Sequence, residues 1–177
     1  MKKNLLMILI NLSILLCSCS AQEDKLKNIP YIEIDKSKIY LRYSTQEDVE
    51  KILGNPSAKE YFKNSLEDFN WNDFTVFFYE DNKLSFHFNN KNEVIRITIN
   101  NQYSKKVKIP IGYLTEVTSK IIIKDLEKSG DKSAYDSIDF ISYSAKDSEF
   151  NSILYSYWID EALKIKWFDV YYENEWE

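Results

Sequence analysis

Few residues of this sequence could perform acid–base, nucleophilic or metal chemistry. His87 is the only histidine, and the alternation of apolar residues around it predicts a solvated position on the polar side of a strand. A zinc site needs several histidine or cysteine ligands at close spacing, and a calcium site needs an acidic loop with a glycine turn. The acidic residues at Asp160-Glu161 and between Asp131 and Asp139 are too sparse for such a loop. The sequence therefore predicts no metal site and no cofactor.

Enzymatic chemistry has equally little support. The glycines are Gly54, Gly112 and Gly130, so a glycine-rich loop that binds phosphate is excluded. A Ser/His/Asp triad would have to use His87, and the sequence contains no nucleophile elbow. Paired carboxylates that cleave glycosidic bonds remain open, because any acidic chain offers such pairs. We expect a protein that is not an enzyme, with a small hydrolase or ligand-binding protein as the alternative.

Cys19 is the residue whose neighbours indicate a specific modification. Two lysines precede an apolar segment, Leu5–Leu16, which has the length of a signal-peptide core and is short for a membrane span. The sequence Leu16-Cys17-Ser18-Cys19 then resembles the bacterial lipobox, in which a leucine and a small residue precede the lipidated cysteine. Cys17 fits this pattern poorly, because the bulky Leu16 would occupy the small position. An ordinary secretory signal cleaved nearby, or an uncleaved anchor, are the alternatives.

Lipidation at Cys19 predicts a signal peptide at residues 1–18 and a tether at residues 19–38. Cleavage would remove Cys17 and leave Cys19 acylated, so no disulfide could form within the chain. More than one acyl chain is needed for stable anchoring in the membrane. The net charge of −5 at pH 7 argues against a nucleic acid partner and against electrostatic adhesion to anionic lipid. We therefore expect a lipid-anchored protein of the cell envelope.

Residues 44–56 carry the signals of one short helix. Ser44 is a suitable N-cap, and Glu47 completes a capping box three residues later. Gly54 suits the left-handed position after a helix, and Pro56 prevents its continuation. Three apolar residues share one face at helical spacing: Val49, Ile52 and Leu53.

A three-stranded antiparallel meander is expected after this helix. The alternating segments Phe74–Tyr79, Leu84–Phe88 and Ile95–Ile99 are separated by turns at Glu80–Lys83 and Asn89–Asn92. Such a meander has one apolar face, which the helix could cover. Other segments are less regular: Ala58–Phe69 is expected to be mixed, Tyr31–Ile34 could add an edge strand, and Ile39–Tyr43 is a short extended segment before the helix.

The order of these elements is similar to that of the SmpA/OmlA family. That family includes the small lipoprotein subunit of the outer-membrane β-barrel assembly machine, and it shares a fold with the β-lactamase inhibitor proteins, which hold two tandem copies. The resemblance covers about Ile39 to Ile99 and implies an outer-membrane lipoprotein without catalytic residues. It departs from the family pattern at Tyr43-Ser44, where a Gly-Met or similar pair is usual. The residues that carry it are Val49, Leu53, Gly54, Pro56, Tyr79, Leu84, Phe86, Val94 and Ile97.

A weaker copy of the same pattern begins about 68 residues later. It predicts a helix from Gly112 to Lys128, although the β-branched residues at 121–123 could instead form a strand. Strands are then expected at Ile138–Tyr143, Ile153–Tyr157 and Leu163–Trp167, with a bulge near Phe168. The predicted fold class is α+β, with short helices packed on antiparallel β-meanders in two tandem αβββ repeats at residues 39–102 and 103–177. One continuous domain with a longer sheet is the alternative.

A binding surface is expected on the polar face of these meanders. If the core residues Ile97, Tyr157 and Ile165 point to one side, alternation directs their neighbours to the other. We predict that Arg96, Trp158, Lys164 and Lys166 line a surface that binds an acidic protein partner, because tryptophan and arginine are favoured anchors at interfaces. The prediction requires the two meanders to form one continuous sheet. An ordinary solvated face is the alternative.

Overall fold

The computed structural model describes residue 26 and residues 29–63, 73–118, 120–124, 135–137, 140–146, 152–162 and 164–172. The predicted signal peptide, Cys17, Cys19 and most of the tether lie outside the described residues. Leu163 and the predicted strand start at Ile138 also lie outside them.

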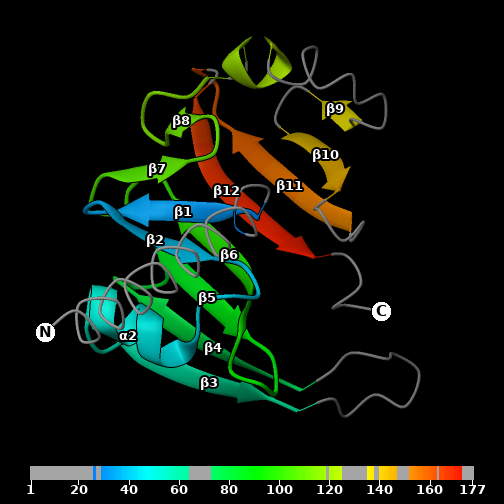
Figure 1. Cartoon of the computed structure of the whole chain (residues 1–177). Helices are drawn as coiled ribbons and strands as arrows, with labels where there is room; N and C mark the ends of the chain where they lie inside the picture. The colour runs from blue at the N-terminus through cyan, green and yellow to red at the C-terminus, as the bar shows by residue number, and fades with distance from the viewer. Residues whose placement is uncertain are drawn as a thin grey trace, which may run out of the picture.

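An eight-stranded antiparallel sheet forms the larger layer of the molecule (Figure 1). Its strand order is β3-β4-β5-β6-β12-β11-β10-β9. The strands are β3 (Ala58–Phe62), β4 (Phe74–Tyr79), β5 (Leu84–Phe88), β6 (Val94–Asn100), β9 (Tyr135–Ser137), β10 (Phe140–Lys146), β11 (Ser152–Ile159) and β12 (Ile165–Tyr172). Because β6 pairs with β12, the two predicted meanders are joined edge to edge in one continuous sheet.

A second, four-stranded sheet covers one face of the first. Its order is β2-β1-β7-β8. The strands are β1 (Tyr31–Ile34), β2 (Ser37–Tyr40), β7 (Val107–Ile109) and β8 (Gly112–Tyr113). Figure 1 shows β1 and β2 crossing in front of β5 and β6. The N-terminal hairpin thus joins β7, a strand that follows it by about 70 residues.

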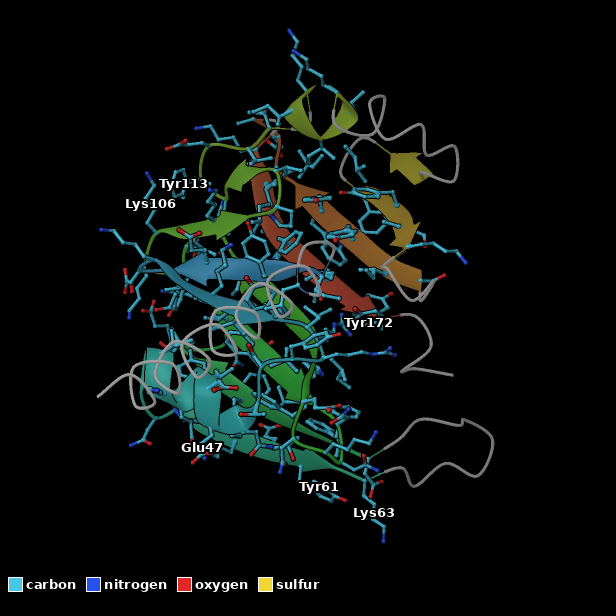
Figure 2. All side chains as sticks on the ribbon, in the orientation of Figure 1. Glu47, Tyr61, Lys63, Lys106, Tyr113 and Tyr172 are labelled. Atoms are coloured by element: carbon cyan, nitrogen blue, oxygen red, sulfur yellow. The ribbon has the colours of Figure 1, made fainter. Side chains whose placement is uncertain are left out.

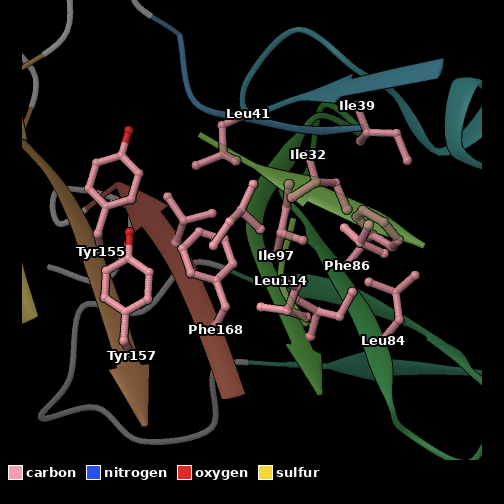
Figure 3. Packing of buried hydrophobic residues seen from close by; sticks show 14 of the residues in the cluster. Ile32, Ile39, Leu41, Leu84, Phe86, Ile97, Leu114, Tyr155, Tyr157 and Phe168 are labelled. Atoms are coloured by element: carbon pink, nitrogen blue, oxygen red, sulfur yellow. The ribbon is translucent and has the colours of Figure 1, made fainter. Parts of the chain in front are cut away.

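The core lies between the two sheets (Figure 3). Ile32, Ile39 and Leu41 of the smaller layer face Phe86 and Ile97 of the larger one. Towards the C-terminal half the core becomes aromatic. There Tyr157 and Phe168 lie with ring centres 5.2 Å apart, and both are fully buried. Alternate residues of each strand supply these side chains, as the period of an extended chain requires.

The α+β prediction, with short helices packed on meanders, is wrong. The described residues are mostly β, with 55% strand and 12% helix, and the strands are arranged as two antiparallel sheets. The physical reason is that the apolar face of the large sheet is covered mainly by another sheet. Residues 31–40, most of which were assigned to the tether, form the β1–β2 hairpin. The strand suggested for Tyr31–Ile34 is present as β1, but it lies between β2 and β7 and not at an edge. The predicted helix from Gly112 to Lys128 is wrong at its start, where the chain forms β8. The β-branched residues at 121–123 are helical and do not form a strand, within a segment described at residues 120–124. Residues 125–128 lie outside the described residues.

The first predicted helix is present as α2 (Gln46–Leu53), shifted by one residue at its start. Its N-cap is Thr45, whose Oγ1 accepts a hydrogen bond from the Asp48 backbone N–H at 3.3 Å, while the Asp48 carboxylate accepts one from the Thr45 N–H at 2.9 Å. The Ser44 hydroxyl oxygen instead accepts the N–H of Tyr40 at 2.9 Å. Ser44 is therefore part of the turn into the helix, and the capping box is one residue later than predicted.

The apolar face of α2 is buried unevenly. Val49 is fully buried, whereas Ile52 and Leu53 are only partly buried against the core. We expected Leu53 to be buried as part of the apolar face of this helix, and it is only partly buried. The end of α2 is fixed by Tyr79, whose hydroxyl donates to the Gly54 carbonyl oxygen at 3.2 Å.

The first meander is confirmed strand by strand as β4, β5 and β6. The chain after α2 adds β3 as a further strand at the edge of the sheet, where irregular structure was expected. The predicted bulge is also present, between Ile165 and Trp167.

Candidate functional site

The candidate site is the outer face of the eight-stranded sheet, which we define as the side directed away from the four-stranded sheet and α2. Strand registers place its residues: Val76 lies opposite His87, His87 opposite Arg96, and Arg96 opposite Tyr171. Thr98 pairs with Asp169, and Trp158 with Trp167. Opposed residues of an antiparallel pair point to the same side. The outer face therefore collects polar and aromatic side chains from both halves of the chain.

One hollow on this face surrounds Trp158. It has a volume of about 490 Å³ and is lined by Thr98, Trp158, Ile159, Lys166 and Trp167. Trp158 is 38% exposed. The bulge between β11 and β12 adds a residue before Trp167, so Lys166 and Trp167 both line the hollow although they are adjacent in the chain.

At the centre of the face, Asp169 binds two neighbours. Arg96 donates from Nε and Nη2 to its two carboxylate oxygens, at 2.9 and 2.6 Å. The Thr98 hydroxyl donates to Oδ1 at 2.9 Å. Asp169 is 1% exposed, so its charge is held in the sheet by these three hydrogen bonds. The charge of Arg96 is in turn balanced by the same carboxylate.

A row of planar groups crosses the face next to this centre. The rings of Phe62 and Phe74 are stacked with centres 5.0 Å apart, and Phe74 stacks on His87 at 5.4 Å. Arg96 lies directly across from His87, and its guanidinium carbon is 5.1 Å from the ring centre of Tyr171. We call this set the planar row. Together with Val76 and Phe78 it lines a groove of about 470 Å³.

His87 is neutral in this position. Burial, and then the nearby positive charge of Arg96, lower its pKa to about 3. Its Nδ1 atom is buried. The sequence predicted a solvated histidine on the polar side of its strand. The side chain lies on that side, but it is only partly exposed, and the ring of Phe74 stacks on it.

The four predicted surface residues are only partly brought together. Trp158 and Lys166 line one hollow. Arg96 lines the neighbouring groove and is paired with Asp169. Lys164 is exposed in the turn between β11 and β12, where it forms an isolated bridge with Thr118, and it lines neither hollow. A single cluster of three free positive charges is therefore not present on this face.

Sequence reasoning missed Asp169, Trp167 and Phe74 as members of the site. The bulge near Phe168 was foreseen, but its phase change was not carried forward to place Trp167 and Asp169 on the outer face. The pairing of β6 with β12 has no local signal, since its partners are 73 residues apart where Arg96 meets Asp169.

The described part of the chain holds neither a candidate metal site nor a helix that could span a membrane. No group of three or more His, Cys, Asp or Glu side chains there could hold a metal ion. No helix among those residues is long and apolar enough to cross a membrane.

Comparisons with known proteins give a distant structural neighbour. No protein-family model matches the chain, and no curated protein matches it. The chain is similar to a DUF4309 family protein (YjgB) from Bacillus subtilis subsp. subtilis str. 168, known from a crystal structure. The sequence identity is 14%, the match covers 75% of this chain and 81% of that chain, and the TM-score is 0.39.

Proposed function

We propose that this chain is a non-enzymatic, lipid-anchored protein of the cell envelope, at the outer membrane, that binds another protein through the Trp158 hollow. The anchoring part rests on the sequence around Cys19 and on the resemblance described above. The binding part rests on one observation: a tryptophan that is 38% exposed stands beside a second tryptophan and an exposed lysine on the outer face of the sheet.

The composition of the hollow supports a protein partner. Trp158 and Trp167 offer large apolar surfaces that gain free energy when they are removed from water. Hot spots of interfaces are enriched in tryptophan and arginine and lie in pockets of this kind. The exposed Lys166 adds positive charge to the hollow, on a chain of net charge −5. The partner that fits is therefore an acidic protein segment that carries an apolar or aromatic side chain.

The experiment is a pull-down from solubilised envelope with the wild-type chain and three variants, read by mass spectrometry. Trp158→Ala removes the apolar anchor, and Lys166→Glu reverses the marginal charge. Tyr113→Ala is the matched control, because Tyr113 is also an exposed aromatic residue (36%) but lies on β8 of the other sheet (Figure 2).

The proposal expects one stoichiometric protein that is retained by wild type and by Tyr113→Ala and lost with Trp158→Ala. Lys166→Glu should weaken its association most at low salt, where marginal charges act over the longest range. If folded Trp158→Ala and Lys166→Glu both retain every protein that wild type retains, the hollow is not the binding surface.

A further inference from the structure

The groove beside the planar row has features that the Trp158 hollow lacks. Its walls are apolar and mostly aromatic: Phe62, Phe74, Val76 and Phe78, closed at one end by His87, Arg96 and Tyr171. A volume of about 470 Å³ falls within the usual range of small-molecule sites. The Trp158 hollow, by contrast, has an exposed lysine in its wall.

The residues that line the groove carry no net charge, and the carboxylate of Glu60, which lies opposite Val76 on the same face, is exposed and is not part of the lining. Arg96 and Asp169 neutralise one another through their two-point ion pair. His87 stays uncharged because burial opposes its protonation. A charged ligand entering this groove would lose hydration without gaining an opposite charge. An uncharged ligand would lose little and would bury apolar surface.

We propose that this groove is a binding site for an uncharged, apolar small molecule of about two or three aromatic rings. The rings of Phe62 and Phe74 would contact the ligand from the edge of the sheet, and Tyr171 with Arg96 would close the inner end. This goes beyond the proposed function, because it uses different residues and a different class of ligand.

The test uses two fluorescent probes that differ by one charge. N-phenyl-1-naphthylamine is neutral, and 1-anilinonaphthalene-8-sulfonate is the same ring system with a sulfonate. Both are titrated into the chain from Ser20 onward, which contains every described residue, in buffer without detergent. The proposal expects saturable binding of one neutral probe per chain. The sulfonate probe should bind at least about tenfold more weakly than the neutral probe, because its charge finds no partner in the groove.

Two substitutions should remove the site without unfolding the sheet. Phe62 is 41% exposed on the edge strand, so Phe62→Glu places a charge in the groove at little cost to folding. Phe74→Ala removes a wall. Each substitution should lower the affinity for the neutral probe by about tenfold or more. Tyr113→Glu is the matched control, because it adds the same charge at another exposed aromatic residue (36%), which lies on β8 of the other sheet (Figure 2).

The outcomes separate this site from the Trp158 hollow. Binding that falls with Phe62→Glu and Phe74→Ala, but stays within about twofold with Tyr113→Glu and Trp158→Ala, supports the proposal. Absence of saturable binding overturns it. Equal affinity for the two probes overturns it as well. If Trp158→Ala abolishes binding of the neutral probe while Phe62→Glu and Phe74→Ala retain it, the probe binds in the Trp158 hollow. That result also overturns the proposal.

Discussion

Arg96 of β6 is bound to Asp169 of β12 at two points, Nε to Oδ1 and Nη2 to Oδ2, although 73 residues separate them. These two strands are the seam at which the first four strands of the large sheet meet the last four. Asp169 is 1% exposed, and Thr98 adds a third hydrogen bond. The pair therefore joins the two halves of the sheet and also balances the charge of Arg96 in the groove.

Arg96→Met should destabilise the fold by about 3–5 kcal/mol, because it leaves the buried Asp169 carboxylate uncompensated. Urea unfolding of wild type and variant measures the loss. The double variant Arg96→Met/Asp169→Leu is the control, and it should be more stable than Arg96→Met alone, since no buried charge remains. Wild-type stability in the single variant would show that Asp169 does not need its partner.

His87 should make stability depend on pH between about 6.5 and 3. In the unfolded chain a histidine takes up a proton below about pH 6.5, whereas in the fold the pKa is lowered to about 3. The unfolded state therefore binds more protons in this window, and stability falls as the pH falls. Between pH 7 and pH 5 the contribution of His87 amounts to a loss of about 2 kcal/mol.

The measurement for His87 is urea unfolding at pH 7, 6 and 5 for wild type and His87→Gln. Titration of carboxylates changes the free energy of unfolding of both proteins equally. The difference between their slopes of stability against pH therefore reports His87 alone. A wild type whose stability falls no more steeply than that of His87→Gln would mean that the histidine is protonated in the fold.

Gly54→Ala and Gly54→Asn should each cost about 1–3 kcal/mol. Gly54 has φ 82° and ψ −168°, a backbone conformation that is essentially restricted to glycine. A Cβ atom added there would meet nothing within 4 Å, so the cost comes from the backbone alone. Thermal unfolding measures both variants. The left-handed helical conformation expected from the sequence would tolerate asparagine, and a neutral Gly54→Asn would therefore favour that conformation.

Cys19→Ala should release the protein from the membrane fraction. Without acyl chains, an acidic chain has little affinity for anionic lipid. Cell fractionation with immunodetection compares wild type, Cys19→Ala and Cys17→Ala, and the last should stay with the membrane. The reverse pattern would move the modified cysteine to Cys17.

The local parts of the fold could be predicted from the sequence. Alternation located β4, β5 and β6, and the capping residues located α2 to within one residue. These elements are set by neighbours in the chain, through turn chemistry and side-chain periodicity. The phase change before Phe168 was visible for the same reason.

The arrangement of the layers could not be predicted in this way. Ile34 pairs with Val107, and nothing in the short polar–apolar pattern of residues 31–40 indicates such a distant partner. Covering the meander with a helix was the simpler expectation, because α2 was the nearest apolar element in the chain. The candidate site could be predicted only in part for the same reason. Alternation along the strand identified Trp158, whereas Asp169 joins the site only because β12 pairs with β6, and no local pattern indicates that pairing.

The place of β12 in the sheet also determines when the protein can finish folding. β12 follows every other described strand in the chain, yet it lies between β6 and β11 near the middle of the sheet. Until it emerges, both neighbours have an open edge, and pairings over such long separations form slowly. With its central strand last, the chain cannot complete the large sheet until nearly all of the described residues have been made.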